Sequence, residues 1–477
     1  MDLRNLSVCQ AAEDIHNGEY TAHDLIEKTL ENGSLLNESL NIFIHQAGVD
    51  ALEQAKAIDL RIEKGEKLPL AGIPVAVKDD ICYGVLPTTF GSGGFSDFYS
   101  PYTATAVERL MEAGAIVVGK TNLDNMSLGS STTSSPKGAT INPWDNSRAA
   151  GSAGAVAVIT GAAMVALESD SGGALRQGAS SCGVAGLRPT GGLVSRHGLN
   201  LHSSSFGQIG VTALTGKNID AVIQVIAGYD QYDASTLISK DESILEVEPV
   251  AIENLKIGFP QSLIEGLEPE FKAICQETIN LFKEQGFEIS DISLKMLPEA
   301  LRAYYVIAQA EASSNHARFD GIRFGSASEA DNLEELYLKS RSNILGREGR
   351  QRSIYGTYLL NKGNFDLYYR QALKVWNLVR REFGLALTGC ELLLMPVVKN
   401  LPPLLSEGKD LISSWEEDIF CAPVSLSGLP ALSFPAGMIG ELPAGLQLVG
   451  PPFSEKTLTT VSDIVVRNKQ LFPHGKA

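Results

Sequence analysis

The sequence predicts an α/β protein with one large mixed sheet, and two patterns support this prediction. Amphipathic helical segments alternate with short apolar strands from about residue 20 to residue 230. The same alternation restarts near residue 254 and continues to a last helix expected at residues 454–468. This pattern is typical of a sheet covered by helices on both sides, so we expect one layered core with a helical insertion.

In the first part of the chain, helices and buried strands are expected in turn. Thr21 and Asp24 form a capping-box pattern at the start of an amphipathic helix, and a second helix is expected at residues 49–64. An apolar strand at residues 70–78 ends in Lys78. The segments that follow are a helix at 103–113 and a buried strand at 115–119.

The second part adds more strands and a group of helices. Strands are expected at 255–259, 287–294, 392–398, 429–435 and 442–449, and helices at 269–286, 296–316, 328–340 and 363–383. No linker or internal repeat separates these segments, so we interpret residues 1–477 as one domain. Its parts are N-terminal helices (1–65), a core (66–230), a second α/β part with the helical insertion (231–385), and C-terminal strands with a helix that close the sheet (386–477).

The composition fits a soluble protein and excludes several classes. Of 477 residues, 44% are hydrophobic, which allows a sizeable buried core. With 39 basic and 56 acidic residues the net charge is −17, which argues against a broad surface for nucleic acid or anionic membranes. The N-terminus has no apolar segment typical of a secretory signal, and the longest mostly apolar run, 154–167, is too short to span a bilayer. We therefore expect a cytoplasmic protein without direct nucleic-acid or membrane contacts.

The six cysteines are scattered along the chain and form no CxxC pair. Histidines also do not occur at spacings typical of metal ligands. We interpret the cysteines as reduced thiols and expect neither a disulfide framework nor a zinc site nor another cofactor.

Residues 149–188 are rich in glycine, alanine and serine and contain the run Ser169-Asp-Ser-Gly-Gly-Ala174. Tandem glycines let the backbone approach a ligand closely, and consecutive N–H groups in a tight turn bind anions. A serine-rich loop beside such a turn suggests a nucleophile that faces an oxyanion hole. The same composition also fits a small-residue helix followed by a turn, and this stretch alone does not separate the two interpretations.

Other motifs surround this stretch in a characteristic order. They are Lys78 followed by two acids, Gly119-Lys-Thr-Asn-Leu-Asp124, Asn142-Pro-Trp-Asp145, Cys182-Gly-Val-Ala-Gly-Leu-Arg-Pro189, Phe365-Asp-Leu-Tyr-Tyr369 and Gly445-Leu-Gln-Leu-Val-Gly450. With these motifs nearly the whole chain resembles the amidase signature family. Within that family it is most similar to the A subunits of glutamyl-tRNA(Gln) and aspartyl-tRNA(Asn) amidotransferases.

The resemblance implies the amidase signature fold and hydrolysis of an amide C–N bond. In the family, a serine attacks the carbonyl, and a second serine in a cis peptide passes its proton to a neutral lysine. Serine needs such a base because it is a weak nucleophile alone, and backbone N–H groups stabilise the tetrahedral oxyanion. Carried over to this sequence, the lysine is Lys78, and the oxyanion turn comprises Ser171, Gly172, Gly173 and the N–H of residue 174.

Two positions depart from the family pattern. The family's nucleophile falls on Ala174, which carries only a methyl group. The segment that should hold the relay serine, residues 150–155, is about three residues shorter than in the family, and Ser152 is its only hydroxyl. Loss of a triad nucleophile typically costs about a millionfold in rate. We therefore expect amidase or glutaminase turnover to be lost or very weak.

The resemblance also implies a substrate clamp. Arg352 and Asp418 match the residues that hold the α-carboxylate and α-amino groups of glutamine, and Tyr305 is expected beside them. An arginine–carboxylate fork and an aspartate–ammonium pair suit an amino acid. The implied partners are a glutamine-like amide or amino acid and the other subunits of an amidotransferase-type complex.

Three hypotheses about function remain open. In the first, a catalytically impaired member of the family still binds an amide or amino acid, or acts within a complex. In the second, an active amidase or acyl-transfer enzyme uses a rearranged pair, for instance Ser152 with Lys78. In the third, the protein is a binding or scaffold subunit that has no small-molecule site.

Overall fold

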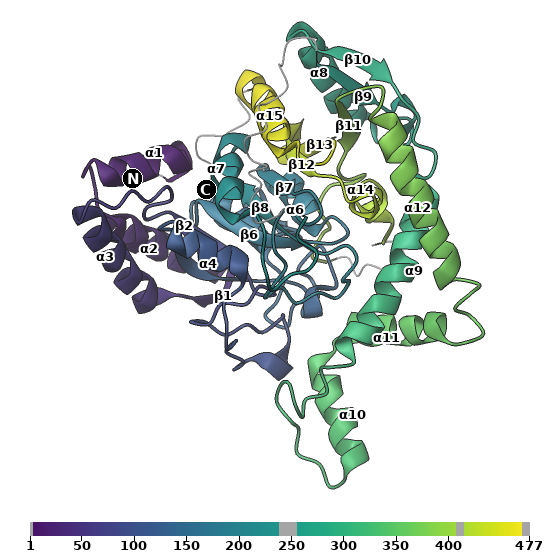
Figure 1. Ribbon diagram of the computed structural model, residues 1–477, viewed down its shortest axis with the longest axis horizontal. Coiled ribbons are helices and arrows are strands. Elements are labelled where there is room, and N and C mark those ends of the chain that lie inside the picture. The colour runs from purple at the N-terminus through teal and green to yellow at the C-terminus, as the bar shows by residue number, and fades with distance from the viewer. Residues whose placement is uncertain (1–2, 238–254, 407–414, 470–477) are drawn as a thin grey trace.

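An eleven-stranded mixed sheet runs through the described part of the chain, which comprises residues 3–237, 255–406 and 415–469 of a computed structural model (Figure 1). Its strand order is β1-β3-β2-β6-β8-β7-β12-β13-β11-β9-β10. The strands are β1 Phe43–Gln46, β2 Pro74–Lys78, β3 Ile116–Thr121, β6 Val165–Asp170, β7 Ala185–Arg188, β8 Gln208–Ala213, β9 Lys256–Phe259, β10 Glu288–Asp291, β11 Leu392–Pro396, β12 Ala431–Ile439 and β13 Leu442–Val449. Strand β2 pairs in parallel with β3 and β6, whereas β8 is antiparallel to both of its neighbours. A separate two-stranded pair joins β4 Ile141–Asn142 to β5 Asp145–Ala149.

Helices flank this sheet, as the sequence predicted. They are α1 Val8–His16, α2 Ala22–Leu40, α3 Gly48–Glu63, α4 Thr105–Glu112, α5 Ala153–Ile159, α6 Ala174–Cys182, α7 Gly216–Ile226, α8 Pro269–Glu284, α9 Leu297–His316, α10 Leu333–Ile344, α11 Arg347–Leu360, α12 Tyr369–Ala386, α14 Ala422–Ser427 and α15 Glu455–Lys469. Helices α5 and α6 pack together and against the sheet, and α7 and α15 form a second such group. Strands β2, β3, β8, β11 and β13 are buried along their whole length because these helices cover them.

Local signals in the sequence define several helix ends. The predicted capping box is present at α2: the Thr21 hydroxyl accepts a hydrogen bond from the Asp24 N–H at 3.0 Å. The Asp24 carboxylate in turn accepts from the Thr21 N–H at 3.0 Å. Both bonds satisfy N–H groups that the first turn of a helix leaves without partners.

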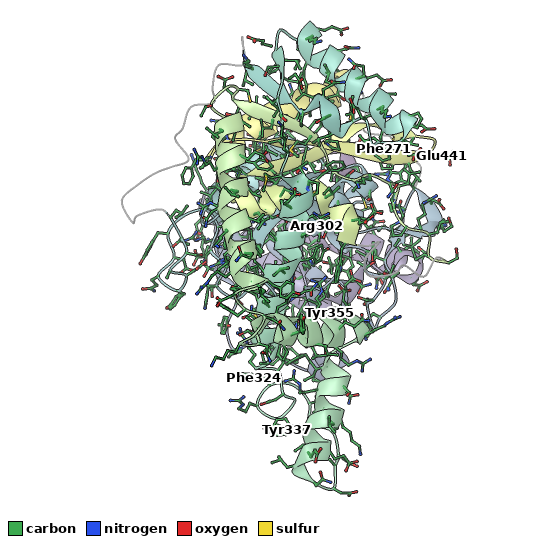
Figure 2. All side chains as sticks on the ribbon, turned by 90° about the vertical axis from the view of Figure 1, so that its right-hand side faces the viewer. Phe271, Arg302, Phe324, Tyr337, Tyr355 and Glu441 are labelled. Carbon is green, nitrogen blue, oxygen red and sulfur yellow. The ribbon has the colours of Figure 1, made fainter. Side chains whose placement is uncertain are left out.

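The helical insertion comprises α9 to α12, and α9 packs against both α11 and α12. Helix α10 projects away from the sheet (Figure 1). In the perpendicular view, Tyr337 of α10 and Tyr355 of α11 lie on this part of the molecule, and both side chains are exposed (Figure 2). The helix predicted at 328–340 is present a few residues later in the chain, as α10. The aromatic run at 365–369 was predicted within a helix, but only its last residue, Tyr369, belongs to α12.

Helix α11 had no counterpart among the predicted elements. Its buried positions are Gly349, Arg352, Gly356 and Leu359, which have helical spacing but include only one large apolar side chain. A Cβ at Gly356 would lie 2.2 Å from the backbone oxygen of Gln309 in α9. The glycine therefore allows two helices to approach closely, and a search for apolar periodicity does not detect such an interface.

All six cysteines are free thiols in the structure. Of the helices that the structure describes, none is both long and apolar enough to cross a bilayer.

Candidate active site

The tight turn between β6 and α6 organises the site. Ser171, Gly172 and Gly173 connect the end of β6 to Ala174, the first residue of α6. Gly173 has a φ of 128°, and a Cβ at this position would lie 2.2 Å from Cβ of Cys421. Only glycine fits here, because the backbone conformation and the neighbouring side chain both exclude a larger residue. The turn therefore presents the first N–H groups of α6, which have no partners within the helix.

A buried network of ion pairs anchors this turn. The carboxylate of Asp170 pairs with Arg176 at 3.0 Å and with Arg188 at 3.4 Å, and all three side chains are almost fully buried. Burial acts to raise the pKa of Asp170, but the two guanidinium groups outweigh it and the pKa is lowered. Arg176 also donates to the side chain of Gln447 in β13 at 2.9 Å. The network thus ties the turn to the C-terminal strands.

A cavity of about 320 Å³ opens at this turn. Six of the residues predicted for the site line it together: Ser171, Gly172, Ala174, Tyr305, Arg352 and Asp418. They come from the β6–α6 turn, from α9, from α11 and from the segment before α14. The fold therefore brings the predicted oxyanion turn and the predicted amino-acid clamp to one cavity.

Asp418 lies at the centre of a polar cluster in this cavity. Its carboxylate accepts a hydrogen bond from the Tyr305 hydroxyl at 2.5 Å and another from Nε2 of Gln177 at 2.7 Å. Burial raises the pKa of Asp418 to about 6, although these hydrogen bonds and the charge of Arg352 oppose the shift. Trp415 stacks on the Tyr305 ring with 4.5 Å between ring centroids. Gln177, on α6, was not among the residues predicted for the site.

Arg352 enters the cavity from α11. Its Nε donates to Glu348 at 2.9 Å, and its Nη2 donates to the backbone oxygen of Leu128 at 2.6 Å. The guanidinium also lies over the Tyr305 ring, 5.7 Å from the ring centroid. The hydrogen bonds formed with the described residues leave Nη1 available to a ligand in the cavity.

Lys78 lies outside the lining of the cavity, at the end of β2. Its Nζ donates to Oγ of Ser169 at 2.8 Å and pairs with the Asp80 carboxylate at 3.6 Å. Asp80 also accepts from the hydroxyls of Ser169 at 2.5 Å and Ser127 at 2.6 Å. The lysine is therefore part of a polar network built around a carboxylate.

Ser152 is engaged in a different network. It caps α5: its Oγ accepts from the Ala155 N–H at 2.9 Å and donates to the Glu168 carboxylate. Glu168 also accepts from Thr212 at 2.7 Å, and burial raises the pKa of this carboxyl. The hypothesis of a rearranged pair needs a hydrogen bond between Ser152 and Lys78. The structure gives each a different partner, so this pair is not formed.

A serine–histidine contact inside the cavity was also not predicted. Nε2 of His202 lies 3.1 Å from Oγ of Ser171, and both residues line the cavity. No sequence motif marks His202, because it lies in an irregular segment between β7 and β8. Within the described ranges no three His, Cys, Asp or Glu side chains are grouped as a metal site would require.

Comparison with known proteins connects this geometry to a family. A model of the amidase family matches residues 24–459 of the chain. The A subunit of the glutamyl-tRNA(Gln) amidotransferase from Chloroflexus aggregans is 39% identical over 472 residues, covering 98% of this chain and 97% of that protein. The corresponding protein from Fusobacterium nucleatum is 39% identical over 468 residues and covers 97% and 96% of the two chains.

Solved structures agree with these matches. The A subunit of the glutamyl-tRNA(Gln) amidotransferase from Thermotoga maritima superposes with a TM-score of 0.80 at 30% identity, over 98% of this chain and 96% of that chain. A bacterial aryl acylamidase has a TM-score of 0.84 over 99% of each chain, and at 20% identity it shows similarity of fold alone.

Proposed function

The chain belongs to the amidase signature family, and from this premise we propose that it binds a glutamine-like amino acid or amide without hydrolysing it through the family's serine. One observation carries the proposal. The clamp residues Arg352 and Asp418 line the same cavity as residue 174, where a methyl group stands in place of a hydroxyl.

Three features argue against the family's catalytic route. Ala174 has no nucleophilic atom. Nζ of Lys78 is hydrogen-bonded to Ser169 and paired with Asp80, and it makes no hydrogen bond with Ser152. Ser152 donates its hydroxyl proton to Glu168 and not toward the lysine. Each of the three groups that the family mechanism requires is therefore absent or engaged elsewhere.

The electrostatics of the cavity favour an amino-acid ligand. The Asp418 carboxylate uses one hydrogen bond on each oxygen and has lone pairs left for a ligand's ammonium group. Nη1 of Arg352 is suited to the carboxylate of the same ligand. A cavity of about 320 Å³ lies at the small end of the range for ligand sites, which suits a ligand of the size of glutamine.

We expect L-glutamine to bind the purified chain without release of ammonia, and Asp418→Asn to weaken binding at least about 30-fold. The loss follows because the amide of asparagine cannot pair with the ligand's ammonium group. Isothermal titration calorimetry measures the affinity, and a coupled ammonia assay measures turnover. Asp366→Asn removes the same charge from an exposed ion pair that does not line the cavity and serves as the matched control. If glutamine and simple amides neither bind nor shift the melting temperature, the scaffold hypothesis takes the place of this proposal.

The pH dependence of binding provides a second arm of the same experiment. Only the ionised form of Asp418 pairs with an ammonium group, and its pKa is about 6. The affinity for glutamine should therefore be constant near pH 8 and fall about tenfold for each pH unit below pH 6. The Asp418→Asn variant should lack this dependence. The same pH dependence in the variant would show that another group governs binding.

We also propose that the protein assembles with other subunits, because its relatives are the A subunits of amidotransferases. Five exposed aromatic and aliphatic side chains on α11 and the segment after it form a surface that we call the α11 patch: Ile354, Tyr355, Tyr358, Leu367 and Tyr368. Exposed patches of this kind mark protein contacts. Tyr358→Glu should abolish co-purification with the remaining amidotransferase subunits, whereas Leu385→Glu, at an exposed position of α12, should not. Equal recovery of both variants would contradict the assignment of the patch.

A further inference from the structure

The cavity contains a contact between a serine hydroxyl and an imidazole that does not involve residue 174. Oγ of Ser171 and Nε2 of His202 lie 3.1 Å apart, which is hydrogen-bond distance for a nucleophile and its base. Both residues line the cavity, so a ligand bound there can reach them. Ser171 is half-buried, and only 8% of His202 is exposed.

Neighbouring groups hold both members of this contact in place. The Tyr304 hydroxyl donates to Oγ of Ser171 at 3.4 Å, so that oxygen is free to donate its own proton to the imidazole. The backbone oxygen of His202 accepts from Nδ2 of Asn315 at 3.3 Å. The next residue, Ser203, donates to Glu311 at 2.7 Å. Two residues of α9 thus anchor the irregular segment that carries the histidine.

The surroundings of His202 keep its imidazole neutral. Burial is the largest cause, and the positive charges of Arg352 and Lys78 act in the same direction, as does His316. Together they lower the pKa of His202 well below its ordinary value of 6.5. In the tautomer protonated at Nδ1, Nε2 has a lone pair directed at the serine hydroxyl.

We propose that Ser171 and His202 form a nucleophile–base pair that accepts acyl groups from activated esters in the cavity. Oγ of Ser171 attacks the ester carbonyl and forms a new C–O bond while its proton passes to Nε2 of His202. The bond to the leaving alcohol breaks, and the imidazolium returns the proton to that alcohol. Water then attacks the acyl-serine, His202 takes a proton from it, and the carboxylic acid and free serine are released.

The backbone next to Ser171 supports this chemistry. The N–H groups of the turn and of the first residues of α6 follow the serine directly in the chain. Such N–H groups stabilise the negative charge of a tetrahedral intermediate. This assignment makes Ser171 the attacking residue, whereas the resemblance to the family implied only an oxyanion-turn role for it. It also limits the reaction to good leaving groups, because no carboxylate among the described residues is hydrogen-bonded to Nδ1 of His202 to support the imidazolium.

A fluorophosphonate probe tests the pair directly. Peptide mass spectrometry of the labelled full-length protein should find the phosphonyl group on Ser171, and Ser171→Ala should abolish labelling of this peptide. His202→Gln should slow the labelling about 100-fold, since a positioned general base contributes at least that factor. Hydrolysis of p-nitrophenyl acetate should fall in parallel in both variants. Ser181→Ala removes another serine that lines the cavity and should leave both rates unchanged.

Chemical rescue protects this test against variants that merely fold poorly. His202→Ala should regain labelling when imidazole is added, because free imidazole replaces the missing base but does not repair a misfolded chain. Labelling at another serine, or an unchanged rate in His202→Gln, would overturn the proposal. The reaction with the probe does not require glutamine binding, so failure of this proposal and failure of the proposed function are separable.

Discussion

Replacing Asp170 with asparagine is expected to lower the free energy of unfolding by about 3–5 kcal/mol. The substitution keeps the shape of the side chain but leaves the buried guanidinium groups of Arg176 and Arg188 without their counter-charge. Neither arginine can reach water, because both are almost completely buried. Urea denaturation followed by circular dichroism measures the loss. Asp366→Asn, whose ion pair with Arg370 is exposed on the surface, should change the stability by less than about 0.5 kcal/mol.

The stability that Asp170 contributes should decrease at low pH. The folded-state pKa of Asp170 is lowered relative to the unfolded chain, so the carboxylate contributes its stability above the unfolded value of about 3.9 and loses it as the pH falls through the folded value. The stability difference between the wild type and Asp170→Asn should therefore be constant from pH 5 to pH 8 and shrink below pH 4. A constant difference at all pH values would show that the loss comes from packing and not from charge.

Much of the fold was predictable because its signals are local. A buried strand such as β11 is a continuous apolar run, and the capping residues of α2 stand in the sequence at the spacing that the hydrogen bonds require. Helix α11 was not predicted, because its interface leaves no such local signal in the sequence. Its buried positions are two glycines, Arg352 and a single large apolar residue, Leu359, so the contact depends on closely approaching backbones and leaves no apolar stripe.

The candidate site was predictable only where a residue belongs to a motif. Ser171, Arg352 and Asp418 could be assigned by resemblance, and the structure brings all three to one cavity. Gln177 and His202 could not be assigned. Their contacts join residues that are 241 and 31 positions apart in the chain, and neither stands in a pattern that signals chemistry. Ser152 could be located in the sequence, but its hydrogen-bond partner could not. That partner is Glu168, and this hydrogen bond determines whether the hydroxyl is available for a relay.

Ala174→Ser is expected to leave amide hydrolysis about a millionfold below that of an enzyme with an intact catalytic triad. The new hydroxyl would stand at the start of α6, beside the turn that offers N–H groups to an oxyanion. It would still lack a base, because the hydrogen bonds of Lys78 lead to Ser169 and its charge is paired with Asp80. Ammonia release from glutamine, measured with a detection limit set by a no-enzyme blank, tests this expectation.

The proton relay is a second obstacle to catalysis in this variant. In the route that the resemblance to the family implies, the proton of a serine at 174 passes to Lys78 through a second hydroxyl, and the one at Ser152 is held by Glu168. Glutamine binding and an unchanged melting temperature must first show that Ala174→Ser is folded. Adding Glu168→Gly to the variant would then free the Ser152 hydroxyl from its present partner. Turnover in the double variant alone would identify Glu168 as the group that blocks the relay. Clear turnover in the single variant would mean that the relay is already intact and that a hydroxyl at residue 174 is sufficient for hydrolysis.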